Sequence, residues 1–352
     1  MTMDQNFSSP ADFLQEMVRV QQIPGAVYAV VNEKQTLTEN AVGYAHLGKK
    51  IPMQLDTLFD LASLTKVCAT LPSILLLVER GVLDFDDPVR RFFPEEENGS
   101  LTLKHLLTHT SGFPPSVPFY QYHWSKEQIL GYILSLDSAP GQKVVYSDLN
   151  FMLLGFLVEK LTKRRLDVFT REHIYQPLKM NHTGFNPDTD LSAVAATEWL
   201  PEQQRYQWGK VHDENANYLG GVSGHAGLFS DLHDLKIYVQ MLLNRGRTEN
   251  GDYFLSPAML QASERNYTRD LGASRGFGWQ LMDDQSPAGY FLSERSFGHT
   301  GFTGTSFWID PERRLGFILL SNRVHISRRI NMNRIRRIFN NLFMSDYSRH
   351  LS

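Results

Sequence analysis

The sequence predicts an α+β protein of the α/β sandwich type, in which an antiparallel sheet is flanked by helices. Three observations support this fold class. Candidate strands rich in β-branched residues lie near the N-terminus, over 26–31 and 36–44. Further candidate strands lie near the C-terminus, over 277–282, 289–297, 303–310 and 314–321. The patterns between these two groups are mainly helical, so both ends of the chain must contribute to one sheet.

This distribution also predicts the domain organisation. A sheet-containing α/β domain would take residues 11–60 and 270–345, and a mostly helical domain would be inserted over 61–269. The chain has 352 residues, which is enough for two intertwined domains. We expect the active site at the interface between them.

The helices are predicted from apolar spacing and from their boundary residues. Phe13, Leu14, Met17 and Val18 lie on one side of a helix over 11–22, which Pro24-Gly25 ends. A long apolar helix follows Ser63 and ends at Gly81. Further helices are expected over 101–108 with Thr102 as N-cap, from Ser125 to 136, over 151–163, from Ser230 or Asp231 to 244, and over 327–344. Residues 184–224 are predicted to form a long irregular loop.

Composition excludes several classes of protein. The chain is 42% hydrophobic and 21% charged with a net charge of −3 and no basic block, so we expect no nucleic-acid partner. The apolar run over 71–78 is too short to span a bilayer, and we expect no transmembrane segment. Residues 1–10 lack a signal-peptide pattern, which predicts a cytoplasmic location, with a secreted parent whose leader was trimmed as the alternative. A monomer is expected.

The motif Ser63-x-x-Lys66 stands at the start of the long apolar helix. In the first helical turn, residues three apart lie on one face, so the Lys66 amine can point at the Ser63 hydroxyl. A serine becomes a useful nucleophile when a neighbouring base takes its proton, and a helix N-terminus offers N–H groups to an oxyanion. An ordinary helix start with a solvated lysine gives the same pattern, so this motif alone is a weak signal.

Two further motifs follow in the chain. Tyr146-Ser147-Asp148 lies at a loop-to-helix junction, where a tyrosine can project into a cleft and act as a base beside a lysine ammonium. A core or surface tyrosine is the alternative. Gly298-His299-Thr300-Gly301 lies in the strand-rich end, where glycines allow a ligand to approach the backbone. A β-bulge or tight turn is the alternative there.

These three motifs, in this order, resemble those of the serine β-lactamase and penicillin-binding-protein-like family, on the side of class C β-lactamases, DD-carboxypeptidases and related esterases. The resemblance covers about residues 20–325. It is reinforced by Gly81-Val82-Leu83-Asp84, Leu106-Leu107-Thr108-His109-Thr110-Ser111-Gly112, Gln176-Pro177-Leu178-Lys179-Met180 and the stretch 221–231. It implies the β-lactamase/transpeptidase-like fold, in agreement with the sheet predicted from both termini.

The resemblance also implies residue roles. Ser63 would be the acylated nucleophile, and Lys66 and Tyr146 would share the proton transfers, although the sequence does not say which takes the Ser63 proton. The backbone N–H groups of Ser63 and Phe302 would form the oxyanion hole. The substrate would also contact Asp148, His299, Thr300 and Gly301. No metal and no organic cofactor are expected.

Two positions depart from the pattern of many family members. His299 stands where many have lysine, and an unperturbed histidine is mostly neutral at pH 7, so a carboxylate anchor is weakened. Asp148 stands where many have asparagine, and its charge would favour an ammonium on Lys66 and repel a substrate carboxylate. Both departures argue against an efficient β-lactamase and favour a substrate that is not read through a terminal carboxylate.

The segment His212-Asp213-Glu214 and the following Gly224-His225 form a second cluster of interest. A metal site is one interpretation. Three adjacent residues reach one ion only through an irregular backbone, so a hydrogen-bonded loop lining the cleft is preferred. His109 is interpreted as a structural residue that fixes the turn after a helix.

The sequence therefore predicts a serine hydrolase that forms a Ser63 acyl-enzyme on an ester or amide. A peptidoglycan-fragment amidase or carboxypeptidase and a small-molecule esterase rank equally. The alternatives are a weak β-lactamase and a non-catalytic penicillin-binding or cell-wall-binding module. The presence of Ser63, Lys66 and Tyr146 together argues against the binding module, because a pure binder does not need all three.

Overall fold

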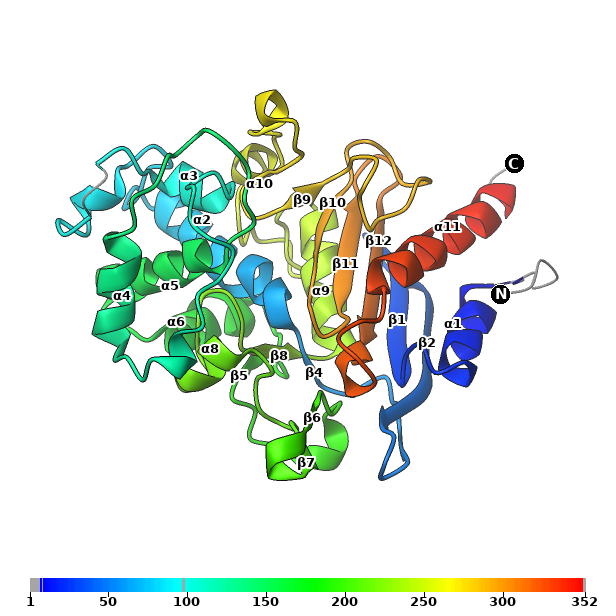
Figure 1. Cartoon of the computed structure of the whole chain (residues 1–352). Coiled ribbons are helices and arrows are strands. Elements are labelled where there is room, and N and C mark those ends of the chain that lie inside the picture. Colours follow the sequence, from blue (N-terminus) through cyan, green and yellow to red (C-terminus); the bar gives the residue numbers. More distant parts are fainter. Residues whose placement is uncertain (1–6, 8, 97–98, 351–352) are drawn as a thin grey trace.

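Strands from the two ends of the chain lie side by side in one large sheet (Figure 1). The computed structural model describes residues 7, 9–96 and 99–350. Within these residues the sheet has seven strands in the order β3-β2-β1-β12-β11-β10-β9, and each neighbouring pair is antiparallel. The strands are β1 (Gly25–Asn32), β2 (Thr36–His46), β3 (Ile51–Pro52), β9 (Gln280–Leu281), β10 (Phe297–Thr300), β11 (Ser306–Asp310) and β12 (Leu315–Ser321). The predicted α+β fold class with a sheet from both termini is confirmed.

The centre of the sheet joins residues from opposite ends of the sequence. Ala26 of β1 pairs with Ser321 of β12, and the register continues to Asn32 opposite Leu315. Both faces of β1 are buried. This explains why the strand is a continuous apolar run in the sequence instead of an alternating one.

Alternate β1 side chains enter two different hydrophobic cores. Val27, Ala29 and Val31 belong to the large core shared with the helical part of the chain. Tyr28 and Val30 belong to a smaller core, which is completed by α1 (Pro10–Arg19) and α11 (Met332–His350). The sheet therefore lies between two helical layers, with α1 and α11 on one face (Figure 1).

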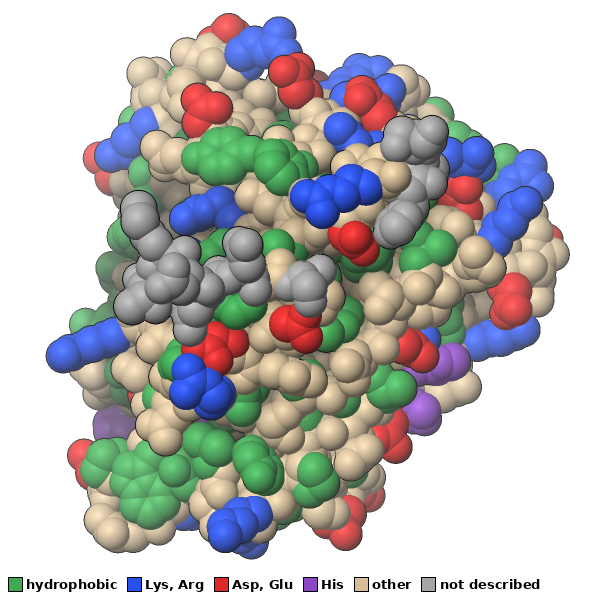
Figure 2. Space-filling view, turned by 90° about the vertical axis from the view of Figure 1, so that its right-hand side faces the viewer, with side chains coloured by type: hydrophobic (Ala, Val, Ile, Leu, Met, Phe, Trp, Pro, Cys, Tyr) green, Lys and Arg blue, Asp and Glu red, His purple; other side chains and the backbone are tan. Residues whose placement is uncertain are grey.

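The outer layer of α1 and α11 faces the viewer in Figure 2. Its visible surface mixes Lys and Arg with Asp and Glu and with scattered apolar side chains. Ser9 caps α1 by accepting a hydrogen bond from the Asp12 backbone at 3.1 Å, and Phe13, Leu14 and Met17 are buried beneath the helix. The predicted amphipathic helix at this end of the chain is confirmed.

The inner layer contains the remaining helices and two small sheets. Helix α9 (Leu232–Leu243) packs on β1 and β12, and the capping residues predicted for three helices, Thr102, Ser125 and Asp231, all accept the expected backbone hydrogen bonds. The other helices are α2 (Leu71–Glu79), α3 (Leu103–Leu107), α4 (Lys126–Leu134), α5 (Asp148–Thr162), α6 (Leu166–Thr170), α7 (Gln176–Leu178), α8 (Glu214–Tyr218) and α10 (Pro257–Ser263). In one small sheet, β8 (Leu228–Ser230) lies between β4 (Phe59–Asp60) and β5 (Gly184–Phe185). In the other, β6 (Trp199–Leu200) pairs with β7 (Arg205–Tyr206).

The strand predicted over 289–297 is wrong, because most of this segment is a loop and β10 begins only at Phe297. Gly289 has a φ of +91°, and Tyr290 is 68% exposed. Ser293 is held by the Asp310 carboxylate through both its backbone N–H, at 2.8 Å, and its hydroxyl, at 2.7 Å. These hydrogen bonds to a side chain take the place of the strand pairing that the apolar pattern suggested.

One helical stretch among the described residues, Ala62–Glu79, is long and apolar enough to cross a membrane. It is longer than the apolar run at 71–78 because Ala62–Leu64 and Lys66–Thr70 are helical turns that lead into α2. The stretch is weak evidence for a membrane span, since 83% of it is buried inside the fold.

A glycine contact between two inner elements predicts a change in stability. A Cβ on Gly224 would lie 2.0 Å from the Phe151 carbonyl oxygen in α5, whereas one on Gly131, in the exposed part of α4, would meet nothing within 4 Å. We expect Gly224→Ala to lower the free energy of unfolding by roughly 1–3 kcal/mol through overpacking.

The matched substitution Gly131→Ala should leave stability unchanged or raise it by up to ~1 kcal/mol, because alanine favours the helix. Thermal and urea unfolding of both variants would measure the difference. Equal stability of Gly224→Ala and the parent protein would contradict the close packing described here.

Candidate active site

The Ser63 segment begins at a short strand and continues directly into the helical layer. Ser63 lies in a 3₁₀ turn, Ala62–Leu64, which is followed by a π-helical turn, Lys66–Thr70, before α2 starts. The prediction that Ser63 occupies the first turn of a regular α-helix is therefore wrong in detail. Ala62 has a φ of +47°, and such backbone strain, of roughly 1–3 kcal/mol, often occurs at functional sites.

The end of the sheet packs directly against the residues before Ser63. Thr303 donates a hydrogen bond to the Asp60 carbonyl at 2.7 Å, and Thr305 donates one to the Leu61 carbonyl at 3.0 Å. Gly301 is required by this approach, since a Cβ there would lie 2.4 Å from the Leu61 oxygen. The third motif is thus brought beside the first.

Lys66 is fully buried and its ammonium contacts three groups. Nζ lies 3.2 Å from Ser63 Oγ, 2.7 Å from Asp148 Oδ1 and 3.1 Å from the His225 carbonyl oxygen. Burial alone would lower the pKa of Lys66, but the Asp148 carboxylate outweighs it, with help from Tyr146, so the pKa is raised above 10.5. The expected ion pair between Lys66 and Asp148 is present, and the site holds a cation directly beside Ser63.

Tyr146 lies within the same group of side chains. The Lys66 ammonium is 5.1 Å from the centre of its ring, and the imidazole ring of His109 packs on it with centroids 4.5 Å apart. His109 also accepts a hydrogen bond from the Ser147 backbone at its Nδ1, at 3.2 Å. The interpretation of His109 as a structural residue therefore extends to Tyr146, whose ring it supports.

His299 is 3% exposed and lies at the other side of Tyr146, with ring centroids 5.9 Å apart. Burial, followed by the nearby charges of Lys66 and Arg275, holds the pKa of His299 well below 6.5, so it is neutral at pH 7. Its Nδ1 donates to the Thr300 carbonyl at 2.9 Å, and Nε2 has no partner among the described residues. Position 299 therefore supplies a hydrogen-bond acceptor and no positive charge.

Phe302 follows the third motif in the turn between β10 and β11. Its side chain is 45% exposed and stacks on His212, while Arg323 donates a hydrogen bond to its carbonyl oxygen at 2.9 Å. The structure places Phe302 and Ser63 on the same cavity, which Thr300 and Gly301 also line. The oxyanion-hole role of the two backbone N–H groups remains a prediction.

The cavity at Ser63 has a volume of about 280 Å³ and is rich in arginine. Arg275, Arg323 and Arg336 all line it, and none of them forms an ion pair with a residue that the structure describes. The Arg275 guanidinium lies 5.5 Å from the centre of the Tyr146 ring. Positive charge is therefore present in the cavity although His299 is neutral.

The sequence did not predict these arginines at the site, because they belong to no recognisable motif. Arg275 lies in the irregular segment before β9, and Arg323 follows β12. Arg336 belongs to the helix predicted over 327–344, for which the sequence indicated no role in the site. It is buried and donates to the Gly301 and Thr305 carbonyls at 2.9 Å and 2.8 Å.

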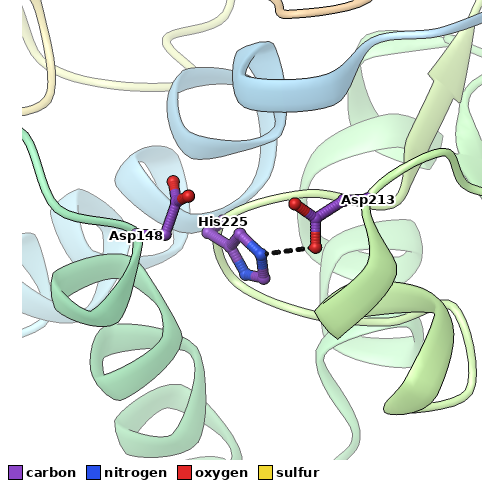
Figure 3. Close-up of side chains that lie close together, drawn as sticks. All are labelled: Asp148, Asp213 and His225. Atoms are coloured by element: carbon purple, nitrogen blue, oxygen red, sulfur yellow. Dashed lines mark hydrogen bonds and ion pairs between the residues drawn. The ribbon is translucent and has the colours of Figure 1, made fainter. Parts of the chain in front are cut away.

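The segments containing His212, Asp213 and His225 are hydrogen-bonded, as the preferred interpretation of the sequence expected, but these residues do not line the cavity that contains Ser63. Asp213 and His225 are joined at 2.9 Å (Figure 3). His212 contacts Glu198 at 3.0 Å. Asp148, Asp213 and His225 bring potential metal-ligating atoms within 4.8 Å of one another. Asp148, however, is already paired with the Lys66 ammonium.

Comparison with known proteins identifies the family. A family model described as Beta-lactamase matches residues 11–340, nearly the whole chain. The chain belongs to the beta-lactamase family. An N-acetylmuramyl-L-alanine amidase of Bacillus subtilis (strain 168) is 35% identical over 353 residues, which cover 86% of this chain and 78% of that protein.

A second relative and a solved structure are similar to this chain as well. A protein of Salmonella agona (strain SL483), provisionally named D-alanyl-D-alanine carboxypeptidase, is 34% identical over 345 residues, covering 86% of this chain and 79% of its own. The class C β-lactamase of Rhodobacter sphaeroides has the same fold, with a TM-score of 0.76 at 19% identity, over 97% of this chain and all of that one. The predicted β-lactamase/transpeptidase-like fold is confirmed, and the protein is a serine hydrolase of the beta-lactamase family. The alternative of a non-catalytic binding module is not favoured.

The site geometry predicts the effect of removing each reactive group. We expect Ser63→Ala to abolish covalent labelling by a fluorophosphonate and hydrolysis of a p-nitrophenyl ester, because Ser63 is the predicted nucleophile that forms the acyl-enzyme. Lys66→Ala and Tyr146→Phe should each lower kcat/KM at least ~100-fold, the usual scale of proton-transfer catalysis.

Intact-protein mass spectrometry and ester kinetics would measure these losses, with circular dichroism as the control for folding. Full labelling of the Ser63→Ala variant would show that the nucleophile lies elsewhere. Unchanged kinetics in both other variants would require a different base.

Proposed function

We propose that this protein hydrolyses an amide bond in peptidoglycan fragments and releases an amino acid or peptide that carries a free carboxylate. The observation that carries this proposal is the presence of three arginines, none in an ion pair with a described residue, around the cavity that contains Ser63 and Tyr146. The proposal takes the substrate class from the chemistry of the cavity and from the names of the two curated relatives.

The arginines favour an anionic group because no acid among the described residues forms an ion pair with them. Arg323 and Arg336 donate to backbone carbonyls, which fixes their positions but leaves their positive charge. Burial, with the neighbouring charge of Arg323, lowers the pKa of Arg336 to about 9, so it is still protonated at pH 7. A substrate carboxylate would relieve this accumulation of like charge.

The position of Tyr146 indicates which part of the substrate carries that carboxylate. The group that protonates the leaving atom must lie next to the leaving group. Since Arg275 lies over the ring of Tyr146, a leaving group at Tyr146 also lies beside Arg275. The carboxylate is therefore expected on the amine product.

A carboxylate on the amine product agrees with the names of the two relatives. The amide in N-acetylmuramyl-L-alanine releases alanine, and that in D-alanyl-D-alanine releases D-alanine; both products are amines that bear a carboxylate. The sequence predicted a substrate that is not recognised through a carboxylate, and this prediction rested on positions 148 and 299 alone. His299 is neutral, in agreement with the prediction at that position. The three arginines, however, bring positive charge to the cavity from other elements.

The proposed reaction divides the proton transfers between two residues. Lys66 is already protonated at neutral pH, so it is a poor acceptor. Tyr146 takes the Ser63 proton in its phenolate form, which the adjacent Lys66 ammonium stabilises. The Ser63 oxygen then adds to the amide carbonyl, and the collapse of the tetrahedral intermediate breaks the C–N bond as Tyr146 returns the proton to nitrogen. Water attacks the resulting ester, and the acid and Ser63 are regenerated. The Lys66 ammonium stabilises negative charge on the phenol and serine oxygens throughout.

The test is to incubate the purified chain with four substrates: N-acetylmuramyl-L-alanine, an acyl-D-alanyl-D-alanine peptide, a p-nitrophenyl ester and a fluorescent penicillin. Products are followed by liquid chromatography and mass spectrometry, with Ser63→Ala as the control. Cleavage of either amide supports the proposal, and the amide that is cleaved decides between an amidase and a carboxypeptidase. Ester turnover without cleavage of either amide would contradict the proposal and favour a small-molecule esterase.

Arg275→Gln provides a direct test of carboxylate recognition. We expect KM for the cleaved amide to rise about 10-fold or more, since one charge-assisted hydrogen bond contributes roughly 1.5–3 kcal/mol. The same substrate with its carboxylate amidated should lose activity with the parent protein and show little further loss with the variant. An equal effect on both substrates would mean that Arg275 does not contact the carboxylate.

His299→Lys should strengthen the binding of substrates with a carboxylate, because it adds a cation at the start of the third motif. The measured quantity is KM for the acid and for its amidated counterpart, with His299→Gln as a neutral control. If lysine and glutamine behave alike, position 299 does not face the substrate acid.

A further inference from the structure

A hydrogen-bonded chain of three side chains lies next to Lys66 and is not used in the reaction described above. His225 is 1% exposed, and its Nε2 lies 2.9 Å from Asp213 Oδ1 (Figure 3). Its Nδ1 lies 2.8 Å from Ser223 Oγ. An ionised carboxylate can only accept, so Nε2 donates to Asp213. Ser223 Oγ completes the chain at Nδ1.

This chain reaches Lys66 in two ways. The backbone carbonyl of His225 accepts a hydrogen bond from the Lys66 ammonium at 3.1 Å. In addition, a carboxylate oxygen of Asp213 lies within 4.8 Å of one of Asp148, and Asp148 is paired with the same ammonium at 2.7 Å. Two carboxylates so close together repel each other unless a cation is shared between them.

Asp213 remains ionised despite this repulsion. Burial raises the pKa of Asp213, but the interactions with His225 and the charge of Lys66 hold it well below its usual range. The electrostatic coupling is mutual, because a charge that stabilises the carboxylate is itself stabilised by it. Lys66 is thus influenced by two acids, of which only Asp148 touches it.

We propose that Asp213, acting through His225, is a positioning residue that fixes the Lys66 ammonium beneath Ser63 and, together with Asp148, keeps it charged. The inference rests on the Ser63 chemistry of the proposed function but not on its peptidoglycan substrate. Neither Asp213 nor His225 lines the cavity that contains Ser63, so both act through Lys66.

The backbone around this chain is held firmly enough for such a role. Asp213 is also the N-cap of α8, where it accepts from the Ala216 backbone at 2.8 Å. The Gly224 carbonyl accepts from Thr70 at 2.7 Å, and Gly224 itself packs against α5, which begins at Asp148. The His225 carbonyl is therefore fixed relative to both the Lys66 turn and the Asp148 helix.

A divalent metal ion is a less suitable interpretation of the same residues. Both His225 nitrogens are already bonded to Asp213 and Ser223, and one Asp148 oxygen is bonded to Lys66. An ion would have to displace an ammonium that is 2.7 Å from its carboxylate. The lysine provides the positive charge that this pair of acids needs.

The chain offers a matched set of variants. Asparagine at position 213 keeps the N-cap and the acceptor oxygen but removes the charge, whereas Asp213→Ala removes all three. Asp231 is the control residue, since it caps α9 through the Asp234 backbone at 2.9 Å and pairs with His182 at 2.7 Å in the same way. Its contacts are with His182, Ser230 and Asp234, not with Lys66.

The readout is the pH dependence of fluorophosphonate labelling at Ser63 and of p-nitrophenyl ester hydrolysis. Removing one negative charge lowers the pKa of each cation and acid nearby. We therefore expect the profile of Asp213→Asn to move to lower pH by about one unit, with kcat about 10-fold lower and KM unchanged. The charged and titratable groups around Lys66 and Asp213 that face this pair are Asp148, Tyr146, His225, His109, His299 and Arg275.

Asp231→Asn should leave both the rate and the profile unchanged. His225→Gln, which keeps a donor toward Asp213, should retain more activity than His225→Ala. If Asp213→Asn shows the parent rate and profile, the charge has no role and the proposal is overturned, even if Asp213→Ala fails to fold. A lower rate without a shift of the profile would also overturn it.

The same experiment separates this inference from the proposed function. Both reagents report Ser63 reactivity without any peptidoglycan, so failure to cleave muramyl or D-alanyl amides leaves the test of Asp213 valid. A parent protein that neither labels nor hydrolyses the ester would overturn both proposals together.

Discussion

The buried ammonium of Lys66 is the constraint on which the site depends. A charge removed from water needs ionic and hydrogen-bonding partners, and each partner of this one comes from a different part of the chain. Ser63 lies on the same turn, Asp148 begins α5, and the His225 carbonyl belongs to the loop before β8. The site is assembled because one cation requires all three, and removing any of them leaves a buried charge without a full set of partners.

The sheet supplies the opposite wall of the site through backbone contacts. Thr303 and Thr305 bind the carbonyls that precede Ser63, and Gly301 permits the close approach. Arg323 donates a hydrogen bond to the Phe302 carbonyl, and Arg336 donates to the carbonyls of Gly301 and Thr305. The same arginines that favour an anionic substrate also hold the turn that carries the expected oxyanion donor, so binding and positioning share residues.

Much of the fold and of the candidate site was predictable from the sequence. The features that were not predictable depend on contacts between distant parts of the chain. Local patterns predicted the sheet strands at both ends, the caps at Thr102, Ser125 and Asp231, and the three motifs with Ser63, Lys66, Tyr146 and His299. They did not predict the irregular turns around Ser63, since the positive φ of Ala62 is imposed by tertiary packing. Arg275 and Arg336 carried no local signal of a shared site, because only the folded chain brings them to the cavity. Asp213 and His225 were recognised as a cluster, but the sequence did not link that cluster to Lys66.

The pairing of β1 with β12 has a consequence for biosynthesis. Ala26 emerges from a ribosome long before its partner Ser321. Contacts between such distant residues form slowly, and until then β1 presents an unpaired apolar edge. The nascent chain therefore carries an aggregation-prone strand until β12 has been made, and a product truncated before β12 would lack the central strand pair of the sheet.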